Sequence, residues 1–228
     1  MYLLGLDVGT SGAKALVIDG AGRVRASATA EYPMSTPRPL WAEQSPEDWW
    51  RASTAAIRAV LRKARARGAD VAGVGLTGQM HGLVLLDRAG KVLRPCIMWN
   101  DQRTASQCAE ITRRVGARRV IKLTGNPVLP GFTAPKIAWV KEHEPAVFRR
   151  SAKALLPKDY IRHRLTGEFF GEVSDASGTS LFDVGRRRWS DEMLAAVGVP
   201  RAWLPEITES PVASAKVSAA AAAVTGLA

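Results

Sequence analysis

The sequence predicts an α/β domain in which a mixed sheet is flanked by helices. Three short strands come first, at residues 2–7, 13–19 and 23–32, with turn residues between them. A helix follows, and further strands and helices then succeed one another to the end of the chain. This order is α/β, but it lacks the regular strand–helix alternation of a doubly wound fold.

The first helix has clear start and stop signals. Ser45 is a typical N-cap residue, Pro46 suits the first helical position, and Glu47 and Asp48 are acids in the first turn. Apolar residues then recur at helical spacing, and Gly68 provides a stop. We therefore expect a helix from residue 46 to near residue 68.

The remaining elements follow from shorter patterns. A strand at 71–77 precedes a strand pair at 83–87 and 92–98, which flanks a turn at 87–90. Beyond these we expect a helix from 103 to about 114, a loop at 125–135, a helix at 136–143, a strand at 154–156, a helix at 157–165, a polar turn at 174–179, a helix at 189–197, and a helix in the alanine-rich end at 218–224.

Composition excludes several classes of protein. The chain has 228 residues, of which 46% are hydrophobic and 23% charged, as in globular proteins. No apolar run approaches the roughly 20 residues needed to cross a bilayer. The two cysteines, Cys96 and Cys108, are too few for a disulfide framework, and the N-terminus has no leader pattern. We expect free thiols, no membrane partner and a cytoplasmic protein.

The formal charge of +11 raises the question of a nucleic-acid partner. The basic residues lie in scattered clusters at 62–67, 113–119 and 186–188, and aromatic residues are not interleaved with them. These clusters are typical of solvated helix faces, with a mild attraction for anionic substrates. We expect no nucleic-acid partner.

The most informative segment is the first hairpin. Its first strand ends near Asp7, and a Gly-Thr-Ser-Gly turn follows at residues 9–12. Turn amides can bind phosphate oxygens, and a carboxylate beside them can attract a hard cation. Neither a P-loop nor a dinucleotide-binding glycine pattern fits the spacing. An ordinary hairpin with a polar turn remains the alternative.

Two further segments have side chains suited to a ligand. Residues 79–81 (Gln-Met-His) follow a strand, where α/β sheets place ligands, although a lone histidine can also be structural. Residues 99–103 (Trp-Asn-Asp-Gln-Arg) suit a polyhydroxylated ligand. Alternatively, Asp101 caps the next helix and Trp99 lies in the core. The polar segment 174–179 is an anion site or, as we favour, a turn.

Taken together and in order, these segments resemble the FGGY carbohydrate kinases, which have the actin-like, RNase H-like (hexokinase-type ATPase) fold. Met80-His81 followed by Trp99-Asn100-Asp101 is similar to the xylulose kinase branch, whereas the glycerol kinase branch has Arg-Glu in place of Met80-His81. The resemblance extends from residue 2 to about 210. The segments that carry it are 5–14, 40–50, 78–82, 99–103, 130–136, 156–160 and 174–179.

The resemblance implies ATP and Mg²⁺ as cofactors and phosphorylation of a ketopentose, most of all D-xylulose to xylulose 5-phosphate. Asp7 would position Mg²⁺ and act in catalysis. Another polyol or ketose, such as ribulose or fuculose, and a non-catalytic actin-like binding module remain alternatives. The phosphate-binding residues would be Gly9, Thr10, Ser11, Gly12 and Lys14, and the sugar-binding residues Gln79, Met80, His81, Trp99, Asn100, Asp101 and Arg103.

The sequence departs from this family in one respect. The usual general base is an aspartate in a Gly-Gly-Gly-Asp-type segment, and residues 1–228 contain none. We therefore expect residues 1–228 to be the N-terminal, sugar-binding domain of a longer kinase, inactive without the C-terminal domain. A homodimer of that longer kinase is compatible with the resemblance.

Overall fold

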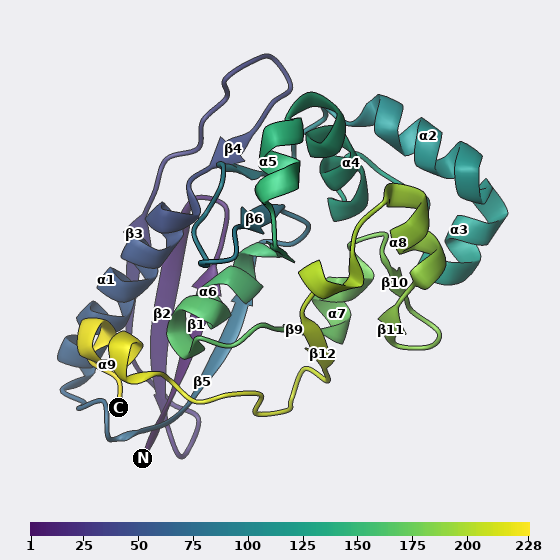
Figure 1. Cartoon of the computed structure of the whole chain (residues 1–228). Coiled ribbons are helices and arrows are strands. Elements are labelled where there is room, and N and C mark those ends of the chain that lie inside the picture. Colours follow the sequence, from purple (N-terminus) through teal and green to yellow (C-terminus); the bar gives the residue numbers. More distant parts are fainter.

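A four-stranded mixed sheet forms one side of the molecule (Figure 1). The computed structural model describes all residues from 1 to 228. Strand β1 (Tyr2–Val8) pairs antiparallel with β2 (Gly12–Asp19) and parallel with β5 (Val71–Gly78), and β3 (Val24–Glu31) pairs antiparallel with β2. The mixed sheet confirms the predicted fold class. The turn after β1 and the end of β5 lie at the same edge of the sheet, because Val8 is in register with Gly78.

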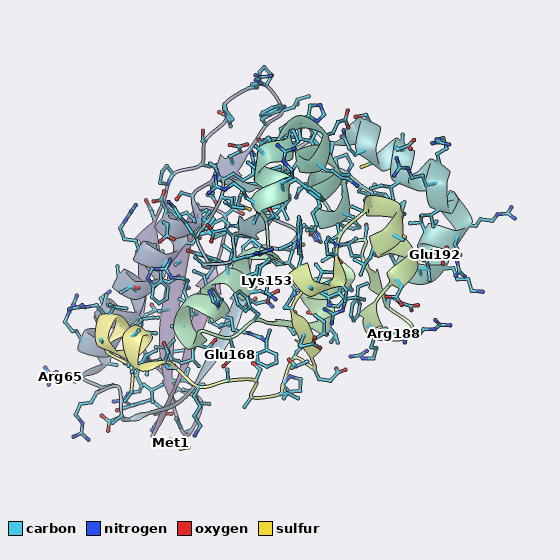
Figure 2. The ribbon with its side chains drawn as sticks, viewed as in Figure 1. Met1, Arg65, Lys153, Glu168, Arg188 and Glu192 are labelled. Atoms are coloured by element: carbon cyan, nitrogen blue, oxygen red, sulfur yellow. The ribbon has the colours of Figure 1, made fainter.

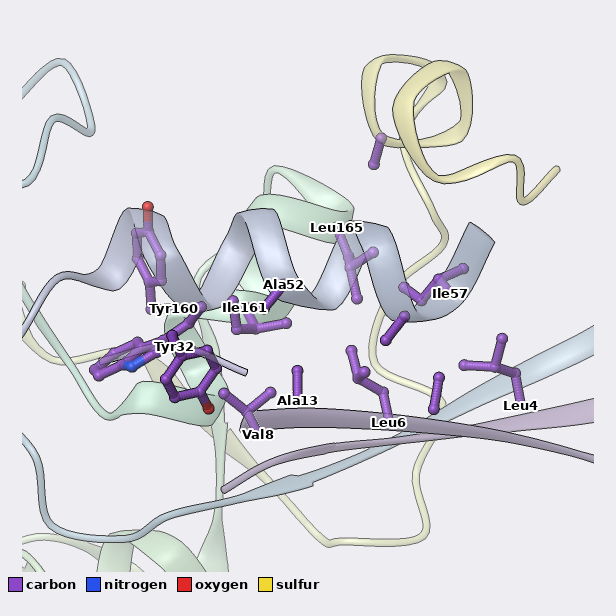
Figure 3. Close-up of a cluster of buried hydrophobic side chains, with 14 of the residues drawn as sticks. Leu4, Leu6, Val8, Ala13, Tyr32, Ala52, Ile57, Tyr160, Ile161 and Leu165 are labelled. Carbon is purple, nitrogen blue, oxygen red and sulfur yellow. The ribbon is translucent and has the colours of Figure 1, made fainter. Parts of the chain in front are cut away.

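Helix α1 (Pro46–Ala64) covers one face of this sheet (Figure 3). Alternate residues of β1 point toward it, and Leu4, Leu6 and Val8 are at most 1% exposed. Alanines on β2 allow the helix to approach closely. The buried side chains of α1 lie at i, i+3 and i+4 spacing: Trp49, Ala52, Ser53, Ala56, Ile57, Val60 and Leu61.

The first helix begins where the sequence predicts and ends earlier than predicted. Ser45 has extended backbone, but its side chain makes no capping hydrogen bond. The helix ends at Ala64 because Arg65 adopts a left-handed conformation (φ 54°) and its amide donates to the Arg62 carbonyl. Gly68 lies beyond this cap.

A second group of helices packs beside the sheet domain (right side of Figure 1). Helix α4 (Thr133–His143) contributes Ala134, Ile137 and Val140, all fully buried, to a second apolar core. Its neighbours are α2 (Ala105–Val115) and α8 (Asp191–Val197), with α3 (Ala117–Thr124) following α2. The helix predicted at 103–114 forms as α2, whereas α3, which begins after Gly116, was not predicted.

The polar segment 174–179 was predicted as a turn, and this prediction is wrong for most of it. Residues Val173–Ser177 form the short helix α7. The Glu172 carboxylate accepts hydrogen bonds from the amides of Ser174 and Asp175, which is a helix N-cap arrangement.

Several other boundaries differ from the prediction. The turn at 87–90 forms, but its flanking strands are short: β6 (Val84–Leu86) pairs with β8 (Lys153–Leu155), and β7 (Cys96–Ile97) pairs with β4 (Glu43–Gln44). Helix α4 begins three residues before the predicted start, and α8 begins after Trp189. The other elements are α5 (Pro145–Arg150), α6 (Pro157–Thr166), β9 (Phe170–Glu172), β10 (Phe182–Asp183), β11 (Arg188–Trp189), a 3₁₀ turn at Arg201–Trp203, β12 (Glu206–Thr208) and α9 (Ala219–Thr225).

Charged side chains are spread around the periphery of the molecule, as Arg65, Arg188 and Glu192 show in Figure 2. Part of the arginine excess is neutralised locally, for example by the ion pair between Arg119 and Glu192. None of the helices has both the length and the apolar character to cross a membrane.

Candidate active site

The tip of the β1–β2 hairpin presents polar groups on a rigid support. The Gly9 amide donates to the Gly12 carbonyl at 3.0 Å, and the Tyr32 hydroxyl donates to the Gly9 carbonyl at 2.6 Å. A side chain at Gly12 would lie 2.8 Å from the Ala30 carbonyl oxygen, so β3 requires glycine there. Ser11 is exposed at the tip, and Thr10 is partly buried. Packing therefore fixes this turn from three sides.

Asp7 lies on the sheet face opposite α1 and is exposed. It is in register with Lys14 on β2 and with Thr77 on β5, both exposed, so the three side chains form a row across the sheet. The Asp7 carboxylate makes no hydrogen bond or ion pair with another side chain. Thr77 was not predicted as a site residue, although its place at the end of a strand is a signal that could have indicated it.

The segment Gln79-Met80-His81 begins directly beside the hairpin tip. The Gln79 amide donates to the Val8 carbonyl at 2.8 Å, and a Cβ on Gly78 would lie 2.8 Å from the same carbonyl oxygen. Met80 is about half exposed, and Gln79 is buried. The structure thus brings the candidate phosphate-binding and sugar-binding segments together at one edge of the sheet.

Gln44 joins these two segments, and sequence reasoning did not select it. Its Nε2 donates to the Thr10 carbonyl at 2.7 Å. Its Oε1 accepts from Gln79 Nε2 at 3.1 Å and from the indole of Trp49 at 2.9 Å. The side chain is only 3% exposed, so these bonds are shielded from water.

Trp99 also contacts the hairpin. Its indole Nε1 donates to Thr10 Oγ1 at 3.1 Å, and the residue is 42% exposed. The alternative that placed Trp99 in the core is therefore wrong. The next residue, Asn100, is partly exposed, and its Oδ1 is enclosed without a hydrogen-bond partner. The structure brings Trp99 to the hairpin and leaves its ring accessible.

Asp101 and Arg103 are occupied by contacts within the chain. The Arg103 guanidinium donates to Asp101 at 2.7 Å and to Glu43 at 2.8 Å, and its side chain is 1% exposed. Asp101 also accepts from the Ala42 amide at 2.7 Å and is fully buried. The alternative that Asp101 caps the next helix is wrong, because the N-cap residue of α2 is Thr104. The pair fixes the chain that leads from Trp99 into α2.

His81 has an uncommon main-chain conformation, and neighbouring groups hold its carbonyl and its ring. Its φ of 64° is left-handed, which is uncommon for a residue other than glycine. Its carbonyl accepts hydrogen bonds from Thr133 Oγ1 at 3.1 Å and from Lys136 Nζ at 3.0 Å. The ring packs against Phe132 with 4.6 Å between centroids. Residues held in this sparsely populated backbone region cluster at functional sites.

Burial and the nearby Lys136 ammonium lower the pKa of His81 to about 4, opposed in part by the main chain of Gly178. The imidazole is therefore neutral at pH 7 and can exchange hydrogen bonds with hydroxyl groups. Lys136 is itself fully buried, and burial lowers its pKa to about 7. It also donates to the Gly131 carbonyl at 2.6 Å. Lys136 was not predicted as a site residue, because its role depends on carbonyl groups far away in the sequence.

A cavity of about 1130 Å³ extends from His81 along the free edge of β5. Met80, His81, Phe132 and Gly178 line one end, and residues 212–217 line the other. The hairpin tip lies outside this cavity. The cavity is lined by His81 and by Thr77, whereas Asp7 is not among its lining residues.

The residues at the hairpin fit a phosphate-bound Mg²⁺ ion. Mg²⁺ in phosphate sites is held by one or two carboxylates together with phosphate oxygens and water. Asp7 is a single, unpaired carboxylate beside a turn with exposed polar groups, and no cluster of three or more potential metal ligands exists in the structure. Asp7 thus suits a metal held mainly by a nucleotide, not an ion bound by protein alone.

The chain is similar to known sugar kinases. A xylulose kinase of Klebsiella pneumoniae is 50% identical over 209 residues, which are 92% of this chain and 42% of the relative. A xylulose kinase of Escherichia coli K12 is 48% identical over the same shares. The crystal structure of a xylulose kinase from Rhodospirillum rubrum superimposes with a TM-score of 0.95 at 31% identity, covering all of this chain and 47% of that one.

This superposition confirms the predicted actin-like, RNase H-like fold. The chain spans less than half the length of the relatives it matches. The model of the N-terminal domain of the FGGY family of carbohydrate kinases matches residues 2–228. The chain therefore belongs to the FGGY family of carbohydrate kinases.

Proposed function

We propose that residues 1–228 form the sugar- and phosphate-binding domain of a kinase that phosphorylates D-xylulose with ATP. The hydrogen-bonded connection from Thr10 through Gln44 to Gln79 supports this proposal most directly, because it holds the phosphate side and the sugar side of the site in one rigid unit. The kinases from K. pneumoniae and E. coli support the choice of xylulose.

In this proposal the hairpin binds the terminal phosphates of ATP. The amides and hydroxyls of residues 9–12 donate to phosphate oxygens, and Lys14 adds a positive charge directly opposite Asp7 in the β1–β2 pair. When bound, Mg²⁺ neutralises phosphate charge. Asp7 holds the ion in place.

The sugar lies between His81 and Trp99. The Trp99 ring offers an apolar face to C–H groups, while Asn100 and the neutral His81 ring hydrogen-bond to hydroxyls. Met80 completes the surface, and the buried Gln79 anchors this segment through its bond to Gln44. We assign Asp101 and Arg103 the task of holding Trp99 and Asn100 in place, because both side chains are buried in their ion pair. Phosphoryl transfer depends mainly on such positioning.

The general base and the adenine pocket belong, in this proposal, to a further domain of the longer kinase. We propose the cytoplasm as the compartment, since it supplies ATP and since Cys96 and Cys108 are both free thiols. A homodimer of the longer kinase and the absence of a nucleic-acid partner are parts of the same proposal.

Binding to this chain tests the proposal. We expect D-xylulose to perturb the NMR signals of His81 and Trp99, and MgATP to perturb those of Thr10 and Gly12. D-ribulose, L-fuculose and glycerol should bind more weakly than xylulose. Appreciable ATP turnover by this chain alone would contradict the assignment of the base to another domain.

Two single substitutions separate the two halves of the site. Asp7→Asn should weaken the response to MgATP and leave the response to xylulose, whereas His81→Gln should do the reverse. Asp191→Asn, an exposed aspartate on α8, is the matched control and should change neither. A chain that binds no sugar, or binds a different sugar best, overturns the proposed substrate.

A further inference from the structure

We infer that Gly178 is a positioning residue for His81: the absence of a side chain at the end of α7 fixes where the imidazole lies. The inference rests on the proposed function, which gives His81 the sugar hydroxyls. It also gives a role to the segment 174–179, which the proposed function leaves unused.

The His81 ring occupies the space where a side chain of residue 178 would begin. A Cβ on Gly178 would lie 2.3 Å from Cε1 of His81 and 2.5 Å from its Nδ1. The next nearest atom, the Asp175 carbonyl oxygen, is at 3.6 Å, an ordinary contact distance. The backbone does not require glycine here, because φ is −86° and ψ is 13°. Only the ring of His81 therefore excludes a larger residue.

Other groups hold the His81 ring and main chain as well. Phe132 lies 4.6 Å away between centroids, and the His81 main chain is fixed through its carbonyl by Thr133 and Lys136. Nδ1 is enclosed without a hydrogen-bond partner. The imidazole thus lies in a slot whose walls include Phe132 and the Gly178 main chain.

The two walls of this slot are connected. The Ala134 amide, in the first turn of α4, donates to the Thr179 carbonyl at 2.9 Å. Thr179 Oγ1 donates to the Ala176 carbonyl at 2.6 Å and ties this segment to α7. Because Phe132 directly precedes α4 and Gly178 directly follows α7, these bonds connect the two segments that form the slot.

The variant Gly178→Ala tests the inference on the free chain. A methyl group would force the ring to move by about 1 Å to reach normal contact distance. We expect a changed NMR signal for the His81 ring and a pKa of His81 closer to 6.5, because the displaced ring is less enclosed. Xylulose binding should weaken by about tenfold or more, since a shift of this size misplaces the hydrogen-bonding group. Gly20→Ala is the matched control, because a Cβ there meets nothing within 4 Å.

If Gly178→Ala unfolds the chain, a double-mutant cycle with His81→Ala tests the inference through stability. In a His81→Ala background the added methyl meets no close atom, so Gly178→Ala should then leave the thermal midpoint unchanged. Equal loss of stability with and without the His81 ring overturns the inference, as does an unmoved ring in a folded Gly178→Ala chain. If the ring is displaced in Gly178→Ala but the parent chain binds no xylulose, the proposed substrate is overturned and the positioning role of Gly178 stands.

Discussion

Gln79 donates a hydrogen bond from Nε2 to Oε1 of Gln44 across 3.1 Å, and both side chains are buried. Through the second bond of Gln44, to the Thr10 carbonyl, the end of β5 is connected to the hairpin tip. A kinase must hold its phosphate donor and its acceptor hydroxyl in a fixed relation. Under the proposed function, this amide pair would provide that relation.

Replacing Gln44 by leucine should destabilise the chain. The substitution removes the hydrogen bonds to Thr10, Trp49 and Gln79 at a fully enclosed position, and unsatisfied buried groups together cost about 2 to 4 kcal/mol. Urea unfolding measures this loss. Gln102→Leu is the matched control, because Gln102 is exposed and its side chain has no hydrogen bond. A loss no larger than that of the control would show that Gln44 does not hold the two segments together.

The hairpin was predictable from sequence because its determinants are local. Alternating strands and the turn at residues 9–12 specify it within some twenty residues. Gln44 was not predictable as a site residue, since its partners Thr10 and Gln79 lie 34 and 35 residues away in opposite directions. Contacts of this kind leave no periodic signal in the chain.

Specific hydrogen bonds and ion pairs also explain the other differences between the predicted site and the structure. Asp101 and Arg103 have the side chains of a sugar site, but Glu43, 60 residues before Arg103, draws Arg103 into a buried ion pair. The segment 174–179 has the composition of a turn, and the Glu172 carboxylate converts it into a helix by capping it. In each case a longer-range or stronger hydrogen bond overrides the local preference.

Lys136→Met should loosen the segment around His81. The ammonium group donates to the carbonyls of His81 and Gly131, and methionine satisfies neither. We expect a loss of about 2 to 4 kcal/mol in the free energy of unfolding, because two buried carbonyls lose their donor. The loss of a buried charge offsets a part of the cost.

Hydrogen exchange measures this effect locally. The amides of residues 80–82 should exchange faster in Lys136→Met than in the parent chain. Lys122→Met, at an exposed position on α3, should leave both stability and exchange unchanged. Unaltered exchange at 80–82 in Lys136→Met would mean that the His81 conformation does not depend on the lysine.

His81 should make the chain less stable as the pH falls from 6.5 to 4. Burial lowers the pKa of His81 to about 4, whereas the unfolded chain takes up this proton near its ordinary value of 6.5. Stability from the neutral ring is therefore fully present above pH 6.5 and declines below it. The loss should reach about 2 kcal/mol once partial exposure of the ring is allowed for. Urea unfolding of the parent and His81→Gln chains between pH 4 and 8 isolates this contribution. If the free energies of unfolding of the two chains change in parallel with pH, the contribution is contradicted.

Glu172→Gln should weaken α7 and with it the wall beside His81. Although burial opposes ionisation, hydrogen bonds from Ser210 and from the amides of Ser174 and Asp175, together with the Lys158 ammonium, lower the pKa of Glu172 to about 2. The carboxylate therefore contributes stability that is fully present above pH 4.5 and is lost as the pH falls from 4.5 to about 2.

In Glu172→Gln, loss of this charged cap should cost about 1 to 3 kcal/mol of unfolding free energy at pH 7. Most of the cost should be lost near pH 2, where about half of the parent carboxyl groups are protonated. A difference that stays constant from pH 7 to pH 2 would assign the effect to packing instead of charge. Glu168→Gln, an exposed neighbour before β9, provides the control for surface charge. The NMR signal of the His81 ring in Glu172→Gln then reports whether the capped helix transmits its order to the site.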